Sequence, residues 1–523
     1  MLKKKFLLKI LIITVLLTFL KIDYRYDYTI NCCSDDFDYF MHASTIALDF
    51  DFDYSNQFDG QVSYKKFGKQ TPIGFVGSGI FSAPFLYIGN LLDLIFNIDQ
   101  KSQILNFKLY FYSLSSVIYF LIGFIFLYKF FELTETKPKK NKLFIFYFGT
   151  GLPYFAFERY SMTHVYEVFS IIIIIYLSGL CYSDSKKNKT FFEILIPLFL
   201  LISFLTRMSN FYIFLIPIIV KKLYFNDTYY NISKKFSFIL SSFISLIIYY
   251  LISNELYGKM ILNPAEIYGN NENYIEKYVV NNSLNEFLIS FLNTIKILLF
   301  SYEFGILWFT PIVFFGFITS IYFLIKNKDF VTFVILICYL FNFGIIHIWQ
   351  STASSYGFRY LFSLIPLSTI IVLKYIKNSK IIYFITLMSI ISIVLLLFFE
   401  TNYNTQLSTD YIINSFNNIV RYSQPNYLPG VIEAMFSLNS YLIIFSTSFL
   451  GSIFFKIFFS VFDYEKVFLS LEKLNLPIYN SDFQNLLIKL EEISFFKLFL
   501  PVLIFYLFTR FLSDEKLQFR NKI

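Results

Sequence analysis

The run from Met162 to Tyr182 reads MTHVYEVFSIIIIIYLSGLCY, and it decides the class of fold. Glu167 is its only charged residue, and its length is that of a helix crossing the roughly 30 Å hydrocarbon core of a bilayer. Similar apolar runs occupy 6–22, 104–130, 142–157, 191–206, 209–225, 236–253, 304–325, 330–349, 358–375, 380–400, 437–460 and, as a further candidate, 494–512. The sequence therefore predicts an all-α, polytopic integral membrane protein with about 12 or 13 transmembrane helices.

The composition agrees with this class. Hydrophobic residues make up 56% of the chain and charged residues 15%, whereas about a quarter of the residues in a soluble domain are charged. The net charge of +8 does not indicate a nucleic-acid partner, because the lysines cluster in short loops between apolar runs. The partners expected from composition are membrane lipids.

The basic loops also predict the orientation. If the lysines at 3–5 lie inside, successive crossings place every basic cluster on the inner side: 137–142, 186–189, 221–235, 326–328 and 374–380. The outer side then receives the acidic segment 23–70, the turn 158–164, Arg207, and the loops 254–286, 350–357 and 401–436. We expect a protein of the plasma (bacterial inner) membrane with a cytoplasmic N-terminus.

Two segments are expected to lie at the membrane surface. The run Ile73 to Phe96 is apolar enough to span, but counting it would move 137–142 to the outer side, and glycines and Pro84 interrupt it. It is therefore predicted to be re-entrant or to lie on the outer surface. The more polar stretch 461–493 is predicted to be an amphipathic hairpin on the inner face.

The outer segment Asn31 to Asn56, NCCSDDFDYFMHASTIALDFDFDYSN, concentrates carboxylates. Asp35, Asp36 and Asp38 could supply a general base, and Asp36 and Asp38 could ligate a divalent cation such as Mg or Mn. A solvated acidic loop or a structural calcium site would give the same pattern. Asp49, Asp51 and Asp53 alternate with other residues, which would place them on one face of an extended segment.

Basic residues at the outer boundary are few. An arginine at headgroup depth is costly unless it meets an anion, so Arg207 and Arg359 are predicted to bind a phosphate, although a lipid headgroup or a loop carboxylate would also satisfy them. Arg159, His164 and Glu167 belong to the turn before the fourth span, where they could orient a substrate or simply cap the helix.

Several short motifs together resemble the GT-C superfamily of glycosyltransferases, in particular the family 39-like branch of protein O-mannosyltransferases and the lipid A aminoarabinose transferase. Asp35-Asp36-x-x-Tyr39 is similar to the Asp-Glu-x-x-Tyr of that branch, with Asp36 in place of Glu. The other similar motifs are Lys69-Gln-Thr-Pro72-Ile-Gly74, Gly305-Ile-Leu-Trp308-Phe-Thr-Pro311 and Gly357-Phe-Arg359-Tyr360. The resemblance covers roughly residues 1–375.

This resemblance implies a GT-C-like helical bundle that transfers a sugar, with inversion, from a polyprenyl-phosphate-linked donor to a lipid, glycan or protein acceptor on the extracytoplasmic face. It implies a catalytic module over 1–400, with the first outer loop at 23–103, and a C-terminal part over 401–523. A transporter or flippase of lipid-linked saccharides, or a ligase, remains the alternative.

The resemblance also assigns roles to single residues. Asp35 would be the base and Asp36 its support or a cation ligand, although the substitution of Glu by Asp leaves the order of the two open. Arg359 and Arg207 would hold the donor phosphate. The residues expected around the substrate are Tyr39, Lys69, Arg159, His164 and Glu167.

Overall fold

A computed structural model describes residues 34–56, 65–98 apart from 67, 106–183 apart from 158, 188–268, 283–301, 305–349, 358–398, short stretches within 411–469, and 495–513. The predicted first span, 6–22, lies outside these residues, and so does most of the predicted amphipathic hairpin at 461–493.

The first half of the described chain is helical apart from one small hairpin. Its elements are α2 (Ser34–Ser44), the π-helical turn η2 (Thr45–Asp49), β1 (Lys65–Lys66), β2 (Lys69–Gln70), α3 (Gly77–Ile95), α4 (Phe107–Glu132), α5 (Lys140–Phe148), α6 (Leu152–Phe157), α7 (His164–Tyr182), α8 (Lys189–Thr206), the 3₁₀ turn η4 (Phe211–Leu215), α9 (Ile216–Tyr224), η5 (Ile232–Lys234), α10 (Phe236–Tyr257) and α11 (Ala265–Tyr268).

The second half follows the same plan. Its elements are α13 (Leu284–Phe300), α14 (Ile306–Phe309), α15 (Pro311–Asn327), α16 (Phe330–Trp349), the 3₁₀ turn η7 (Arg359–Leu364), α17 (Ile365–Tyr375), α18 (Ser379–Leu397), β3 (Tyr411–Asn414), β4 (Ile419–Tyr422), α19 (Leu428–Ala434), α21 (Phe449–Val461) and α24 (Phe495–Ser513). Each strand pair is an antiparallel hairpin of its own, β1 with β2 and β3 with β4.

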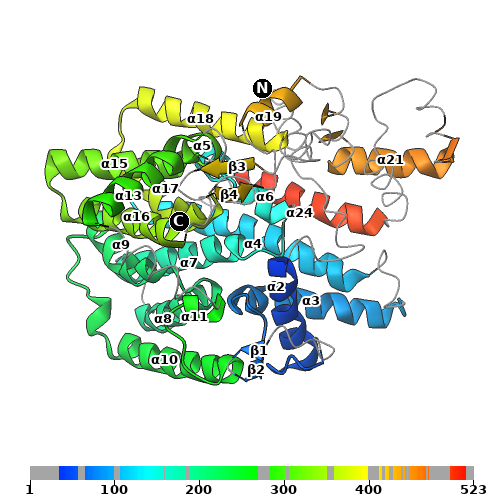
Figure 1. Ribbon diagram of the computed structural model, residues 1–523, viewed down its shortest axis with the longest axis horizontal. Helices are drawn as coiled ribbons and strands as arrows, with labels where there is room; N and C mark the ends of the chain where they lie inside the picture. The colour runs from blue at the N-terminus through cyan, green and yellow to red at the C-terminus, as the bar shows by residue number, and fades with distance from the viewer. Residues whose placement is uncertain are drawn as a thin grey trace, which may run out of the picture.

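Helix α7 forms the centre of the bundle (Figure 1). It packs against α4, α8, α9 and η7, and 94% of an 18-residue stretch of this helix is buried inside the molecule. A helix that is apolar on all sides lies either in a protein core or against lipid, and the burial of its five isoleucines, Ile171 to Ile175, places α7 in the core. In the same view α10 lies along the lower edge and α18 along the upper edge.

Seven helices among the described residues are long and apolar enough to cross a membrane: α3, α4, α7, α8, α10, α16 and α18. The predicted class, an all-α membrane protein, is confirmed, with the two hairpins as the only described strands. Several other predicted spans are divided. The run 142–157 is interrupted at Gly149–Gly151, between α5 and α6.

Proline explains three further divisions. Pro217, Pro311 and Pro366 lie in the first turn of α9, α15 and α17, where the missing N–H costs nothing. The residues before them form η4, α14 and η7 instead of continuing the same helix. Each predicted span at 209–225, 304–325 and 358–375 is therefore a short turn followed by a shorter helix.

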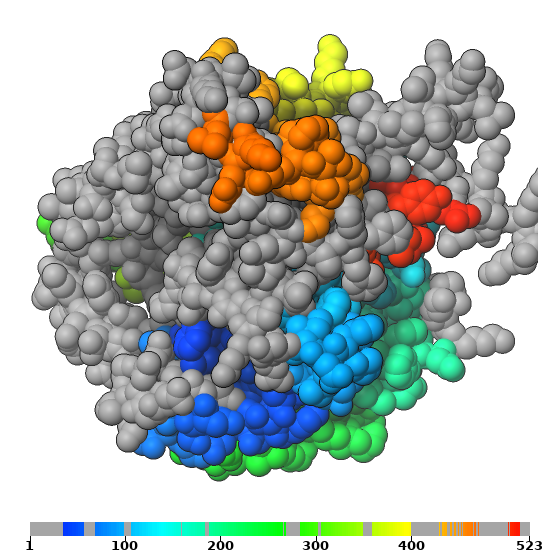
Figure 2. Space-filling model, turned by 90° about the vertical axis from the view of Figure 1, so that its right-hand side faces the viewer, coloured from blue at the N-terminus to red at the C-terminus, as the bar shows by residue number. Residues whose placement is uncertain are grey.

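Residues 77–95 of the segment predicted to be re-entrant or surface-lying form one continuous helix, α3, which packs against α4 and is long and apolar enough to span. The glycines and Pro84 do not interrupt the helix, and its place in a membrane stays a prediction. Its glycines are contact points. A Cβ on Gly79 would lie 2.5 Å from Cβ of His42, and one on Gly89 would lie 2.5 Å from the carbonyl oxygen of Phe107. Figure 2 views the end of the molecule where α2, α3 and the start of α4 reach the surface.

Lysines from separate loops gather at one end of the bundle. Lys189 and Lys235 both lie over the ring of Tyr230, at 4.5 and 4.7 Å, and Lys374 lies 4.9 Å from the ring of Tyr224. The predicted clustering of basic loops on one side therefore has a counterpart in the fold. Which side of a membrane this end faces stays a prediction.

Candidate functional site

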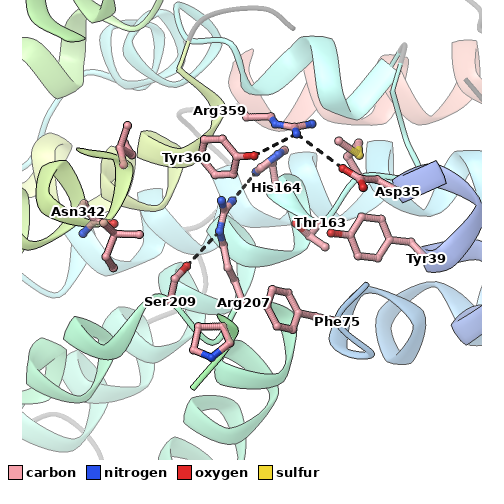
Figure 3. A pocket seen from close by; sticks show the side chains of 14 residues that line it. Asp35, Tyr39, Phe75, Thr163, His164, Arg207, Ser209, Asn342, Arg359 and Tyr360 are labelled. Atoms are coloured by element: carbon pink, nitrogen blue, oxygen red, sulfur yellow. Dashed lines mark hydrogen bonds and ion pairs between the residues drawn. The ribbon is translucent and has the colours of Figure 1, made fainter. Parts of the chain in front are cut away.

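A pocket of about 250 Å³ lies at the start of α7, and Tyr182 at the other end of this helix is next to Lys221. Figure 3 shows the pocket from close by. Segments far apart in the sequence form its walls: α2, the loop before α3, the start of α7, the segment after α8, α16 and η7. Its lining residues are Asp35, Tyr39, Phe75, Met162, Thr163, His164, Arg207, Ser209, Pro264, Asn342, Ile345, Ile346, Arg359 and Tyr360.

Helix α2 carries the acidic motif, which the sequence placed in a loop. Asp35 and Asp36 stand in its first turn, where carboxylates interact favourably with the positive end of the helix dipole. Neighbouring residues on a helix point in different directions. Asp35 therefore faces the pocket, whereas Asp36 points into the protein.

The two aspartates have different partners. Asp36 accepts a hydrogen bond from Arg159 at 2.7 Å, and both side chains are almost fully buried, at 4% and 3% exposure. Asp35 lies 3.6 Å from Arg359 and keeps 45% of its side chain exposed. Only the Asp35 carboxylate is thus open to a molecule in the pocket.

His42 fixes the back of α2. Burial lowers its pKa to about 4, so the ring is neutral at physiological pH. Its Nε2–H donates to the carbonyl oxygen of Gly74 at 2.8 Å, and its Nδ1 then accepts from the hydroxyl of Tyr54 at 2.7 Å. These bonds tie α2 to two later segments of the chain, one of which is the loop that carries Phe75 into the pocket.

Asp38 is a third carboxylate beside the pocket, buried behind Asp35. Burial and the charge of Asp35 raise its pKa to about 7, and the backbone of Ile73 and Gly74 opposes this rise. A group with such a pKa changes charge near neutral pH. The protonation state of Asp38 therefore decides whether the protein carries a second negative charge next to Asp35.

Arg207 belongs to a buried polar cluster at the start of α7. Its Nη1 lies 3.4 Å from Glu167 and 3.2 Å from Nδ1 of His164. Nδ1 of His164 also lies 3.4 Å from Glu167, so the imidazole, the guanidinium and the carboxylate form one cluster. Glu167 also accepts from the amide of Asn210, so its charge is matched without a ligand.

Tyr360 connects the two pocket arginines. Its ring faces the guanidinium carbon of Arg207 at 4.4 Å and that of Arg359 at 5.1 Å, and its hydroxyl accepts from Arg359 at 3.2 Å. Cations are stabilised over an aromatic face. Nη2 of Arg359 is the guanidinium nitrogen that contacts both Tyr360 and Asp35, so this end of the side chain is the one turned to the pocket.

Most of the predicted site residues meet at this place. The pocket lining includes Asp35, Tyr39, His164, Arg207 and Arg359, while Asp36, Arg159 and Glu167 support it from behind. Lys69 does not join them. It pairs with Glu255 at 3.2 Å on the surface, and both side chains are largely exposed.

The predicted cation ligands do not face a common ion. Asp36 and Asp38 are two residues apart on a helix, so their side chains diverge, and Asp36 is already paired with Arg159. Within the described residues no group of three or more His, Cys, Asp or Glu side chains could hold a metal. Cation dependence stays a prediction.

The prediction for Asp49, Asp51 and Asp53 is wrong. They follow α2 through the turn η2 and exposed bends, where Asp51 accepts from the N–H of Asp53, and Asp53 from that of Ser55, both at 3.0 Å. These are local turns, typical of aspartate in loops, and not one face of a strand.

Tyr360 and Asn342 are among the pocket residues that the sequence reasoning missed. Tyr360 stands in the motif quoted for Arg359, but a single tyrosine carries little information in a chain with 42 of them. Asn342 is an amide in the middle of the apolar helix α16, and its polarity in a predicted span was a usable signal.

The fold and its apolar helices define this chain as an all-α, membrane-embedded protein. Comparison with protein-family models, with curated proteins and with solved structures found no match.

Proposed function

We propose that this protein is a membrane glycosyltransferase that transfers a sugar from a polyprenyl-phosphate-linked donor to a lipid, glycan or protein acceptor on the extracytoplasmic face. The observation that carries the proposal is an accessible carboxylate, Asp35, that pairs with Arg359 in a pocket which Arg207 also lines. The motifs that resemble the GT-C superfamily supply the reaction.

Each charged group has a role in the proposed step. The Asp35 carboxylate takes the proton of the acceptor hydroxyl, and the acceptor oxygen forms a bond to the anomeric carbon. The bond from that carbon to the phosphate oxygen breaks, and the electron pair leaves with the polyprenyl phosphate. Arg359 and Arg207 stabilise the charge that develops on this phosphate.

The size of the pocket agrees with a small polar substrate unit. Drug-sized ligands occupy roughly 300–1,000 Å³, and this cavity, at about 250 Å³, lies just below that range. It favours one sugar phosphate over an oligosaccharide. The lipid chain of the donor and the acceptor would lie outside it.

The test is a transfer assay with the Asp35→Asn variant in reconstituted membranes, using a panel of synthetic polyprenyl phosphate monosaccharides labelled in the sugar. A general base contributes roughly 10²–10⁴-fold, so we expect transfer to fall by that factor. Asp53→Asn is the matched control, because Asp53 is exposed and makes only a local turn. Undiminished transfer by Asp35→Asn would contradict the proposal.

A further inference from the structure

A second, larger cavity lies outside the candidate site, on the membrane-facing side of α8. It has a volume of about 700 Å³ and is an open groove between α9 and α10. Helix α10 packs against α8, and α9 packs against α7. The space between α9 and α10 is therefore floored by α8 and open to the side.

The walls of this groove are apolar for most of their length. Leu200 and Leu201 on α8 form its floor, and Phe214, Ile218 and Leu246 on the two flanking helices form its sides. The last three side chains are each about half exposed. In a membrane such a surface is covered by hydrocarbon chains.

One end of the groove is polar and basic. Lys221 and Lys222, in the last turn of α9, line it together with Asn231 and Ser233. The ammonium of Lys221 lies 5.8 Å from the ring of Tyr182, which also lines the groove, so its charge is placed at this end. At the opposite end the described lining residues, Met260 and Leu262 among them, are uncharged.

The length of the groove matches one leaflet. On α10 its lining residues run from Phe238 to Tyr249, which at 1.5 Å per residue is about 16 Å. Half of a bilayer's hydrocarbon core is about 15 Å. A ligand with its head at the lysines would thus extend its chains to about the middle of the membrane.

A buried hydroxyl lies along this path. Ser245 lines the groove, is 7% exposed, and has no hydrogen-bond partner for its Oγ among the described residues. It lies seven residues, about 10 Å, along α10 from Phe238, at the depth of the acyl chains and not of the headgroup, so it takes no part in recognising the head.

We propose that the groove between α9 and α10 binds an anionic diacyl phospholipid from the leaflet on the lysine-rich side, with its phosphate at Lys221 and Lys222 and its acyl chains over α8. This site is separate from the arginine pocket, which lies at the other end of the helices. Its occupancy does not depend on the proposed transfer reaction.

The experiment uses the full chain in nanodiscs of phosphatidylcholine that contain a trace of phosphatidylglycerol with a photoreactive acyl chain. Labelled peptides are identified by mass spectrometry, and a phosphatidylcholine probe with the same chain serves as the reference. Each lysine near an anionic headgroup favours binding by about fivefold, so two lysines predict about a 30-fold preference for phosphatidylglycerol on α8, α9 and α10.

Two pairs of variants separate the contributions of head and chain. Lys221→Gln with Lys222→Gln should abolish the preference, whereas Lys326→Gln with Lys328→Gln, which removes two lysines outside the groove, should keep it. Ser242→Trp fills the groove and should abolish the labelling. Phe243→Trp, on the neighbouring exposed position of α10, should not.

Three results would overturn the inference. They are equal labelling by the two probes, a preference that survives the loss of Lys221 and Lys222, and displacement of the labelled phospholipid by an equimolar polyprenyl phosphate. The last result would show that an isoprenoid chain is the occupant. All these readouts are independent of enzymatic activity.

Discussion

Replacing Asp36 with asparagine removes the counter-charge that lies 2.7 Å from the buried guanidinium of Arg159. Both side chains are almost fully excluded from solvent, so water cannot replace the lost carboxylate charge. We therefore expect Asp36→Asn to destabilise the fold strongly, while Asp35→Asn, one residue earlier, does not.

The magnitude follows from the burial of the two pairs. Removing one partner of a buried ion pair costs about 3–5 kcal/mol, which lowers the ratio of folded to unfolded protein by roughly two to three and a half orders of magnitude. Asp35 is 45% exposed and lies 3.6 Å from Arg359, so the loss of its charge should cost no more than about 1 kcal/mol.

The assay is reversible unfolding in mixed micelles with increasing mole fraction of sodium dodecyl sulfate, followed by tryptophan fluorescence. The double variant Asp36→Leu with Arg159→Met replaces the ion pair by apolar side chains and should recover most of the lost stability. Equal stability of Asp36→Asn and the wild-type protein would refute the assignment of Asp36 to a buried structural pair. A double variant no more stable than Asp36→Asn would refute the electrostatic explanation.

Three further outcomes are expected. Tyr360→Leu removes the ring between Arg207 and Arg359 and should raise the KM for the donor about tenfold. Tyr360→Phe loses only the hydroxyl and should raise this KM less. A KM of the Tyr360→Leu variant equal to that of the wild-type protein would refute this role of the ring. Folding raises the pKa of Asp38 to about 7, so between pH 4 and 7 the folded protein holds a proton that the unfolded chain has released. The free energy of unfolding should therefore fall by up to about 4 kcal/mol as the pH rises from 4 to 7, and stay constant above pH 7. Asp38→Asn should remove this fall, as measured by unfolding at several pH values, and an unchanged slope would exclude Asp38 as its source. Gly79→Ala should cost about 1–3 kcal/mol because its Cβ meets His42 at 2.5 Å, while Gly344→Ala, with nothing within 4 Å, should not destabilise the fold in the same unfolding assay.

The class of fold was predictable from the sequence because the membrane requires long apolar helices. The run 162–182 became α7, and the runs at 104–130, 191–206, 236–253, 330–349 and 380–400 became long helices with ends within a few residues of those expected. Hydropathy could not reveal the divided spans. Hydropathy measures how apolar a run is, whereas three of these runs are divided where a proline starts a new helix and the fourth is divided at Gly149–Gly151.

The gathering of the site residues was also expected, since Asp35, Arg207 and Arg359 were all placed on one face. What each residue contacts was not. Asp36 and Lys69 looked equivalent to their neighbours in the motifs, and only the burial of one and the exposure of the other separate them. Such differences come from contacts between distant segments, which spacing along one segment does not encode.

The contact between Asp35 and Arg359 has a consequence for the order of events. In the free protein the two charges partly neutralise each other across 3.6 Å, while 45% of the Asp35 side chain stays exposed. In the proposed reaction an arriving phosphate competes with Asp35 for the same guanidinium. Once the phosphate has taken over Arg359, Asp35 loses its positive neighbour, and its carboxylate becomes a stronger base for an acceptor that binds after the donor.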